Sequence, residues 1–431
     1  MKLKIDTARK IGGEIKVPGD KSISHRSIIF NSIAEGTGLI SGFLESEDCL
    51  NTVRAFQSMG VTIERTDNGD YRVGGVGLYG LREPDKIIDC GNSGTTMRLL
   101  TGLLAAQDFY TVLSGDNSLC QRPMDRIIVP LEKMGAEIWS RQNNYAPLSI
   151  KGQNLNGINY RLPVASAQVK SAIILAGLYA GEKVEIIEPG MSRDHTEKML
   201  TGFGVDINKN GNQIILNNCK KIQLKAGEIN IPGDISSAAY FIAAALIIPD
   251  SELILRNIGI NPTRSGFLKI IKNMGADVEI YNKRDCSGEP AADIRVVSSP
   301  LEATIIKGDV IPTVIDELPL IALLAAWARG ETLIKDAEEL RVKESDRIKI
   351  TVNGLRKLGV YVEEYDDGML IKGPAELNGG IEIDCFYDHR IAMSFAILGL
   401  SIDGGITIKK SEAINTSFPE FPKILDEICS F

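Results

Sequence analysis

The sequence predicts an α/β protein with two pseudo-symmetric domains, each made of three repeated α/β units. One pattern carries this prediction: a turn rich in Gly, Ser, Asp or Pro, followed by an apolar helix-like run, recurs six times along the 431 residues. A second observation gives the division into halves, because the first and fourth repeats begin almost identically, with Val17-Pro-Gly-Asp20 and Ile231-Pro-Gly-Asp234. Six α/β units are too many for one hydrophobic core, so we expect two domains.

The six repeats keep a spacing of roughly 70 to 85 residues, which is longer than that of solenoid repeats. An amphipathic helix, a glycine and a short β-branched strand follow the turn in each of the first five. The glycine stands where a helix C-cap favours this residue, which predicts two helices and several strands per unit. The turns begin at Pro18, Gly91, Pro163, Pro232, Asp316 and Asp388, and the glycines are Gly60, Gly135, Gly204, Gly275 and Gly359.

The symmetry of the two Pro-Gly-Asp turns also sets the expected domain boundaries. Residues 20–230 form one domain, and residues 1–19 together with 231–431 form a second, discontinuous domain, because the segment before Pro18 has a strand pattern but no unit of its own. We expect the active site in the cleft between them. The polar segment from Asn282 to Ala292 predicts a surface loop.

Composition excludes several classes of function. Charged residues make up 24% of the chain and hydrophobic residues 44%, which is an ordinary globular balance. The net charge of −8 argues against general affinity for nucleic acid, so any anion site must be built locally. The longest apolar runs, 238–248 and 318–328, are far shorter than the roughly 20 residues that span a bilayer. The N-terminus lacks the apolar core of a signal peptide, so we expect a cytoplasmic protein without membrane association.

Cysteine and histidine give no sign of a metal or disulfide. The seven cysteines, Cys219 among them, form no CxxC pair and are odd in number, so we expect most of them to be small core residues. His25, His195 and His389 are far apart and lack zinc-site spacing, and we expect neither a metal nor a cofactor. The stretch 75–80 matches GxGxxG, but Pro84 stands where the helix of a dinucleotide site should run, which favours a plain turn.

The first repeat has features of an anion site. Lys21, Ser22 and Arg26 lie at and just inside a predicted helix start, where backbone N–H groups and the helix dipole favour an anion. For one helix, a cap with solvated charges is the simpler interpretation. The recurrence of polar and cationic side chains in the other turns favours a ligand with several phosphate or carboxylate groups. These side chains are Asn92, Thr95, Arg98, Arg122, Ser166, Gln168, Lys170, Ser192, Arg193, Lys343, Arg347, His389 and Arg390.

Two acidic residues among these cations are candidate bases. Asp316 and Glu344 lie in cation-rich strings, and carboxylates near fixed positive charge stay ionised and can accept protons. Alternatively, Glu344 pairs with Lys343 or Arg347 on a helix surface. Spacing in the sequence leaves both interpretations open.

Taken together, six motifs resemble those of the 5-enolpyruvylshikimate-3-phosphate synthase family, and the resemblance covers essentially the whole chain. It implies an inside-out α/β barrel fold of two domains with three units each, closing when substrate binds. It implies transfer of the enolpyruvyl group of phosphoenolpyruvate to the 5-hydroxyl of shikimate 3-phosphate through a tetrahedral intermediate, with no metal, cofactor or covalent enzyme adduct. The motifs are Pro18-Gly-Asp-Lys-Ser-Ile-Ser-His-Arg26, Gly91-Asn-Ser-Gly-Thr-Thr-Met-Arg98, Gln121-Arg-Pro-Met124, Ser192-Arg-Asp-His-Thr-Glu197, Leu340-Arg-Val-Lys-Glu-Ser-Asp-Arg347 and Asp388-His-Arg390.

The resemblance also implies roles for individual residues. Asp316 would take the proton of the 5-hydroxyl, Glu344 would exchange a proton with the methylene carbon of phosphoenolpyruvate, and Lys21 would lie near the reacting centre. The residues implied for shikimate 3-phosphate are Lys21, Ser22, Arg26, Ser166, Ala167, Gln168, Arg193, Asp316 and Lys343. Those implied for phosphoenolpyruvate are Lys21, Gly94, Arg122, Gln168, Arg347 and Arg390.

The chain departs from the family pattern at two positions. Ala167 stands where many members have a second serine, and Thr416 stands where some have a lysine that touches phosphoenolpyruvate. Gly94 is typical of members that are sensitive to glyphosate, so we expect competitive inhibition by that compound. As partners we expect the two small-molecule substrates, no nucleic acid and no membrane, and we expect a monomer.

Two other functions are weighed against this one. The related UDP-N-acetylglucosamine carboxyvinyltransferase has a Lys-Asn pair in the first helix turn, where this chain has Lys21-Ser22, and a reactive cysteine before an Arg-Pro. Cys120 lies only two residues before Arg122, nearer than the cysteine of that relative. The third function is a non-catalytic protein that binds an anion at the same helix ends.

Overall fold

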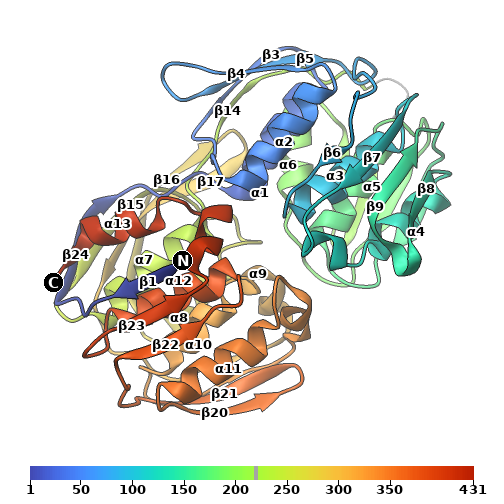
Figure 1. Ribbon diagram of the computed structural model, residues 1–431. Coiled ribbons are helices and arrows are strands. Elements are labelled where there is room, and N and C mark those ends of the chain that lie inside the picture. The colour runs from blue at the N-terminus through green and yellow to red at the C-terminus, as the bar shows by residue number, and fades with distance from the viewer. Residues whose placement is uncertain (218–221) are drawn as a thin grey trace. The chain divides into compact units, whose positions relative to one another are not determined.

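The computed structural model describes residues 1–217 and 222–431, so Cys219 lies outside the described residues. The described chain divides into two compact units, which Figure 1 shows with their elements labelled. Unit 1 comprises Met1–Pro18, Pro232–Arg284 and Pro290–Phe431, and unit 2 comprises Gly19–Ile231 and Asp285–Glu289.

Unit 2 contains three four-stranded sheets in the part of the chain that is described. In each sheet the strand at one end runs parallel to its neighbour, and the other neighbouring strands pair antiparallel. In spatial order the sheets are β14 (Glu228–Asn230), β3 (Glu35–Ser41), β5 (Tyr71–Val76) and β4 (Thr62–Arg65); β6 (Ile88–Asp89), β7 (Tyr110–Ser114), β9 (Tyr145–Lys151) and β8 (Glu137–Arg141); and β10 (Ile158–Arg161), β11 (Val184–Ile187), β13 (Gln213–Leu216) and β12 (Ile207–Asn210).

Unit 1 repeats this pattern, again with three sheets among its described residues. The parallel pairs are β2 with β15, β18 with β19, and β22 with β23. The sheets are β1 (Lys2–Ile5), β23 (Ile406–Lys409) and β22 (Ile381–Asp384); β16 (Asp277–Cys286), β17 (Glu289–Val297), β15 (Glu252–Gly259), β2 (Lys10–Ile15) and β24 (Cys429–Ser430); and β18 (Ile305–Ile306), β19 (Gly330–Ile334), β21 (Gly368–Gly373) and β20 (Tyr361–Tyr365). The recurrence of one strand order confirms the predicted fold class of repeated α/β units.

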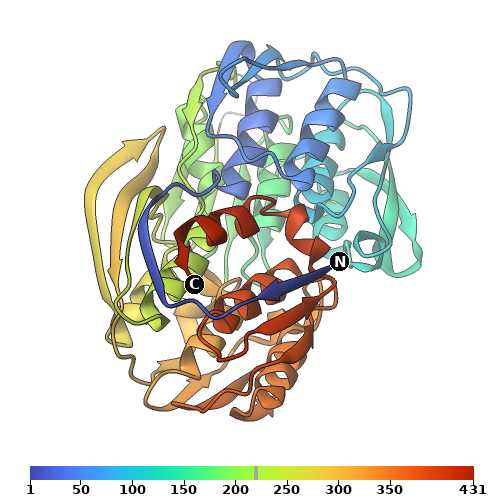
Figure 2. The same cartoon turned by 60° about the vertical axis from the view of Figure 1, so that its left-hand side comes forward.

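The helices that follow the six turns lie toward the middle of each unit, with the sheets outside (Figures 1 and 2). In unit 2 these are α1 (Lys21–Ser32), α3 (Gly94–Leu104) and α5 (Ala167–Gly177), and in unit 1 α7 (Ile235–Ile247), α10 (Leu318–Ala325) and α12 (His389–Gly399). Helices of one unit pack against one another. Almost all of their side chains are buried, because a helix that is apolar all round is stable only when covered on every side.

In the first five repeats a glycine follows the second helix, as predicted. The glycines after α2 (Glu47–Ser58), α4 (Asp125–Lys133), α6 (His195–Gly202), α8 (Gly266–Asn273) and α11 (Arg347–Lys357) all have φ between 88° and 99°. This left-handed conformation is unfavourable for residues with a Cβ, so the C-cap prediction is confirmed. Two further short helices in unit 1 are α9 (Ile311–Val314) and α13 (Phe421–Ile428).

The prediction of a surface loop from Asn282 to Ala292 is wrong. This segment belongs to the long hairpin of β16 and β17, drawn in yellow in Figure 2. Only Ser287 and Gly288 form the turn, with φ of 53° and 86°. Two consecutive residues with positive φ are the connection that suits the twist of a tight hairpin, so polar composition hid a two-residue turn.

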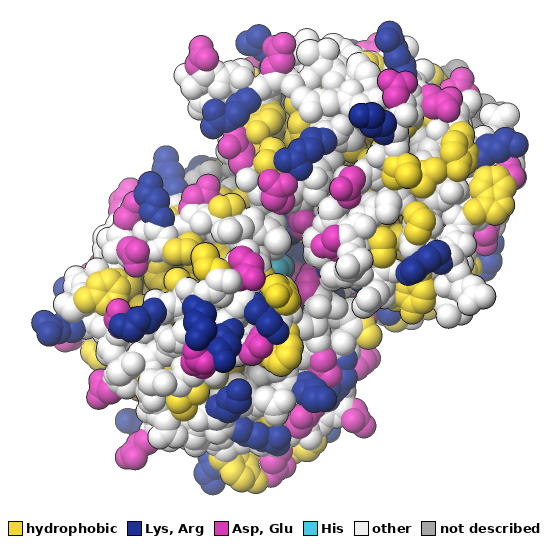
Figure 3. Space-filling model, in the orientation of Figure 1, with side chains coloured by type: hydrophobic (Ala, Val, Ile, Leu, Met, Phe, Trp, Pro, Cys, Tyr) yellow, Lys and Arg dark blue, Asp and Glu magenta, His cyan; other side chains and the backbone are white. Residues whose placement is uncertain are grey.

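Opposite charges are interspersed on the visible face of each unit (Figure 3). In unit 1, Lys410 Nζ lies 2.9 Å from Asp384 Oδ2, and Lys2 and Lys409 both pair with Glu382. Within the described ranges, the helices are too short or too polar to cross a membrane. The same ranges hold no cluster of His, Cys, Asp and Glu side chains suited to a metal ion.

Candidate active site

The first turn of α1 holds Lys21 beside a carboxylate. The Asp20 side chain caps the helix by accepting a hydrogen bond from the Ile23 N–H at 2.9 Å, which fixes the start of the helix. Lys21 is the first helical residue, and its Nζ lies 2.5 Å from Oδ2 of Asp48 on α2. The Lys21 side chain keeps 24% of its surface exposed. It is therefore an oriented cation at the positive end of a helix.

Arg26 joins three elements of unit 2. Its Nε donates to Thr196 Oγ1 at 2.7 Å on α6, its Nη2 to Ser171 Oγ at 2.8 Å on α5, and its Nη1 to the Ser22 carbonyl at 2.9 Å. Burial lowers the pKa of Arg26 to about 10, although the nearby charge of Glu197 opposes this shift. The guanidinium is still protonated at neutral pH. Arg26 is only 3% exposed, so it is a deep, fixed cation.

Gly94 begins α3 next to two guanidinium groups. A Cβ placed on Gly94 would lie 2.8 Å from Arg98 Nη1 and 3.5 Å from Arg122 Nη1. Arg122 follows a short 3-10 helix (Leu119–Gln121), and its Nη2 donates to Asn92 Oδ1 at 2.7 Å. The absence of a side chain thus lets both guanidinium groups come close to the start of α3.

The first turn of α5 presents Ser166, Ala167 and Gln168. Ser166 is the N-cap and accepts from the Val169 N–H at 3.5 Å. Gln168 Oε1 accepts from Arg98 Nη1 at 2.8 Å. This bond ties the starts of α3 and α5 together. Arg193 precedes α6, and its charge acts on Arg26.

In unit 1, Arg347 at the start of α11 is held by three carboxylates. Its Nε donates to Asp388 Oδ2 at 2.8 Å, its Nη2 to Glu344 Oε2 at 2.5 Å, and its Nη1 to Asp316 Oδ1 at 3.4 Å. Burial alone would lower the pKa of Arg347, but Asp388 and Glu344 raise it above its usual range. The two candidate bases therefore share one buried arginine.

Arg390, near the start of α12, shares one of these carboxylates, Asp316, with Arg347. Its Nη2 lies 3.7 Å from Asp316 Oδ2, and its Nη1 lies 3.4 Å from Glu317 Oε1. Burial lowers the pKa of Lys343, against the opposing charge of Asp316. Asp316, Glu344, Lys343, Arg347 and Arg390 thus form one cluster in unit 1.

The structure gathers the predicted residues into two groups, one per unit. Unit 2 holds Lys21, Ser22, Arg26, Gly94, Arg122, Ser166, Ala167, Gln168 and Arg193, and unit 1 holds the five residues just named. Sequence reasoning did not assign roles to the partners that orient them. The sequence could have indicated two of these partners: Asp388 lies inside one of the motifs, and Glu317 follows Asp316 directly. The partners not assigned are Asp48, Ser171, Thr196, Glu317 and Asp388.

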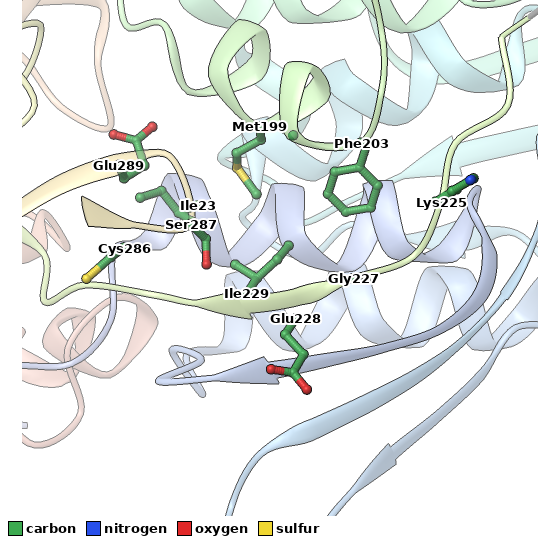
Figure 4. A pocket seen from close by; sticks show the side chains of 11 residues that line it. Ile23, Met199, Phe203, Lys225, Gly227, Glu228, Ile229, Cys286, Ser287 and Glu289 are labelled. Atoms are coloured by element: carbon green, nitrogen blue, oxygen red, sulfur yellow. The ribbon is translucent and has the colours of Figure 1, made fainter.

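Unit 2 has two further features besides these residues. Cys120 is half-buried, and its thiol donates to the Gly115 carbonyl at 3.3 Å. A cavity of about 190 Å³ is enclosed by Met199, Phe203 and Ile229, which surround one space in Figure 4, with Cys286 and Glu289 at its border. Among the described residues that line it, no predicted site residue occurs.

Comparison with known proteins gives consistent results over the whole chain. A family model described as EPSP synthase (3-phosphoshikimate 1-carboxyvinyltransferase) matches residues 5–425. A 3-phosphoshikimate 1-carboxyvinyltransferase of Geobacter sulfurreducens is 52% identical over 98% of this chain and 97% of its own. One of Magnetococcus marinus is 50% identical over 97% of this chain and 94% of its own.

Solved structures show the same likeness. An EPSP synthase from Acinetobacter baumannii superposes with a TM-score of 0.90 at 46% identity, covering 99% of this chain and 98% of that one. The enolpyruvyl transferase NikO from Streptomyces tendae has a TM-score of 0.81 at 15% identity, covering 99% and 97%, and so shares the fold.

Proposed function

Because this chain belongs to the EPSP synthase (3-phosphoshikimate 1-carboxyvinyltransferase) family, we propose that it transfers the enolpyruvyl group of phosphoenolpyruvate to the 5-hydroxyl of shikimate 3-phosphate and releases inorganic phosphate. The family expected from the sequence motifs is confirmed. The names of the relatives do not favour the sugar-nucleotide transferase or a binding protein without turnover.

One observation supports this chemistry above the others: Asp316 and Glu344 both form ion pairs with the guanidinium of Arg347. An arginine binds phosphate or carboxylate in the same forked geometry as it binds Asp or Glu. A substrate anion that binds Arg347 and Arg390 therefore competes with the side chains of Asp316 and Glu344. Binding of phosphoenolpyruvate would release both carboxylates for proton transfer at the moment when the substrate is in place.

In the proposed reaction, the two carboxylates act on different atoms. The 5-hydroxyl oxygen forms a bond to C2 of phosphoenolpyruvate while Asp316 takes its proton, and C3 gains a proton from Glu344, which has taken up this proton after leaving Arg347. In the second step C3 returns a proton to Glu344, the C2=C3 double bond forms again, the bond from C2 to the phosphate oxygen breaks, and the proton held by Asp316 passes to the leaving phosphate. General acid–base catalysis by such groups contributes about 10²- to 10⁴-fold.

Residues of both units have binding roles in this proposal. Ser22, Arg26, Ser166, Ala167, Gln168 and Arg193, with Lys343 and Asp316 of unit 1, hold shikimate 3-phosphate. Gly94, Arg122 and Gln168, with Arg347 and Arg390 of unit 1, hold phosphoenolpyruvate, and Lys21 contacts both substrates. Fixed charges that need no reorganisation suit a step in which negative charge shifts between oxygens.

The test is phosphate release by the purified chain with phosphoenolpyruvate and, in parallel, shikimate 3-phosphate or UDP-N-acetylglucosamine. We expect release with shikimate 3-phosphate only, and a loss of about 100-fold or more in kcat for Asp316→Asn and for Glu344→Gln. Glu252→Gln is the matched control, since it removes an exposed pair with Arg295. Release with the sugar nucleotide alone, or binding without release, would reject the proposal.

A further inference from the structure

The three central helices of unit 1 each begin with a buried carboxylate that faces an arginine. Asp234 at α7, Glu317 at α10 and Asp388 at α12 are 6%, 4% and 0% exposed. Their partners are Arg264 at 2.9 Å, Arg390 at 3.4 Å and Arg347 at 2.8 Å. This pairing recurs at three equivalent helix starts, and at each start one carboxylate holds the arginine in place.

Glu317 differs from the other two because it does not cap its helix. Asp234 Oδ1 accepts from the Ser236 N–H at 2.8 Å, and Asp388 Oδ1 from the Arg390 N–H at 2.9 Å. Among the described residues, the backbone of α10 donates no such bond to the Glu317 side chain. A capping role therefore does not explain why a carboxylate is buried there.

The surroundings of Glu317 fix its orientation toward Arg390. The Ser236 hydroxyl donates to Glu317 Oε1, and Arg264 Nη2 donates to the same hydroxyl oxygen at 2.7 Å. An ionised carboxylate with so little exposure is unfavourable unless a cation and hydrogen bonds compensate its lost hydration. Arg390 and Ser236 offset part of this cost, although burial still raises the pKa of Glu317 above its ordinary value.

Arg390 thus has two carboxylate neighbours with different freedom. Asp316 is 14% exposed on its side chain and also lies on Arg347, whereas Glu317 is 4% exposed and bonded to Ser236. A base must leave its arginine to reach the 5-hydroxyl, but Arg390 still has to be held in place when this happens. We propose that Glu317 is a positioning residue that fixes the guanidinium of Arg390 for phosphoenolpyruvate while Asp316 acts as the base. This inference rests on the proposed function.

The test separates the two substrates in steady-state kinetics of the full chain. Glu317→Gln keeps the shape and the acceptor oxygen but removes the charge. We expect the KM for phosphoenolpyruvate to rise about tenfold or more, equivalent to about 1.4 kcal/mol, with the KM for shikimate 3-phosphate and kcat changed by less than about threefold. Glu317→Asp restores the charge and should recover part of the affinity.

A merely structural role would change both KM values alike, or lower the melting temperature without a KM split. Ser236→Ala is a second variant that leaves the charge of Glu317 in place and loosens its orientation. It should raise the KM for phosphoenolpyruvate by a smaller factor, and it decides the case if Glu317→Gln does not fold. Glu252→Gln is the control for loss of an arginine–carboxylate pair outside the cluster.

The outcomes distinguish this inference from the proposed function. An active wild-type chain with an unchanged KM for phosphoenolpyruvate in folded Glu317→Gln or, failing that, in Ser236→Ala, would overturn the inference alone. A wild-type chain without turnover would reject the proposed function and this inference together.

Discussion

Lys21 and Arg347 lie against carboxylates, and this pairing sets the electrostatics of the site. Asp48 pairs with Lys21, and three acidic residues surround Arg347. A buried cation such as Arg347 needs counter-charges, because hydration is lost on burial, whereas Lys21 keeps 24% of its side chain exposed. In the proposed function, a substrate anion that binds Lys21 or Arg347 exchanges with these carboxylates, and this exchange favours ligands with phosphate or carboxylate groups.

Gly94→Ala tests the close approach of Arg98 and Arg122 to the start of α3. The new Cβ would approach Arg98 Nη1 to 2.8 Å, and Arg98 cannot yield without straining its bond to Gln168. We expect the KM for phosphoenolpyruvate to rise about tenfold, as for the loss of one oriented contact. Glyphosate should inhibit the wild-type chain competitively with phosphoenolpyruvate and the variant more weakly. Steady-state kinetics with both ligands measures each effect.

The control for this prediction is Gly202→Ala, where a Cβ would meet nothing within 4 Å. Equal kinetics for Gly94→Ala and the wild-type chain would show that the space at α3 is not used by phosphoenolpyruvate. Unchanged activity of the wild-type chain at millimolar glyphosate would contradict the inhibition.

His25 makes stability depend on pH. It is fully buried, and its Nδ1 lies 2.7 Å from Thr52 Oγ1. Burial, and then the charges of Lys21 and Arg26, lower its pKa well below 6.5. Below pH 6.5 the unfolded chain binds a proton here that the folded chain does not, so the free energy of unfolding falls as the pH falls.

The expected slope from His25 is at most about 1.4 kcal/mol per pH unit below pH 6.5, and none well above it. Chemical unfolding of the wild-type chain and of His25→Gln between pH 5 and 8 measures it. The stability advantage of the wild-type chain over the variant should shrink as the pH falls. A constant difference across this range would show that His25 titrates alike in both states.

Among the helices and strands, the sequence predicted those features for which the local backbone conformation requires one residue type. The glycines after α2, α4, α6, α8 and α11 were predicted because a left-handed C-cap favours glycine in any context. The hairpin of β16 and β17 was missed because residues 282–290, which contain its turn, are mostly polar, and polarity was taken as the sign of a loop. Its turn uses Ser287 and Gly288, a pair that gives a weaker hairpin signal than Asn-Gly.

Lys170→Met tests a buried charge cluster that joins α5, α6 and Glu188, the residue after β11. Lys170 Nζ lies 3.1 Å from Glu188 Oε2 and 2.6 Å from Glu197 Oε1, and the lysine side chain is 0% exposed. Removing the cation leaves two carboxylates buried without their counter-charge. We expect a loss of about 3–5 kcal/mol in the free energy of unfolding, measured by urea denaturation.

Lys183→Met is the matched control. Lys183 pairs with Glu185 at 2.7 Å, but its side chain is 54% exposed, so its loss should cost less than about 1 kcal/mol. Similar small losses in both variants would mean that the buried carboxylates near Lys170 take up protons or water at little cost.

For the whole molecule, the limit of sequence reasoning lies in pairings between distant residues. The repeats and the turns at Pro18 and Pro232 predicted six units, because each turn carries its own local signal. The bonds from Arg26 to Thr196 and from Arg347 to Asp388 join residues 170 and 41 positions apart, and only the packed fold selects them. The assignment of site residues to substrates stays a prediction until variants are measured.

The tip of the β16–β17 hairpin is the part of the molecule with the least local signal. The strands belong to unit 1, whereas the tip Asp285–Glu289 belongs to unit 2. Glu289 Oε1 lies 2.8 Å from His195 Nδ1, both side chains being at most 3% exposed. His195 begins α6, two residues after Arg193, which is proposed to hold shikimate 3-phosphate. The tip therefore contacts the start of α6 from 94 residues away in the sequence, close to the residue proposed to hold shikimate 3-phosphate.

Glu289→Ala should weaken this contact at the level of the whole chain. A buried imidazole that loses its acceptor costs about 1–3 kcal/mol, so the melting temperature should fall. The KM for shikimate 3-phosphate should rise several-fold while the KM for phosphoenolpyruvate stays within about twofold, because the loop moves near one substrate only. Asp285→Asn, at the same tip but exposed and bonded to the Gly288 N–H, is the control. A lower melting temperature with both KM values unchanged would show that the tip stabilises unit 2 without orienting Arg193.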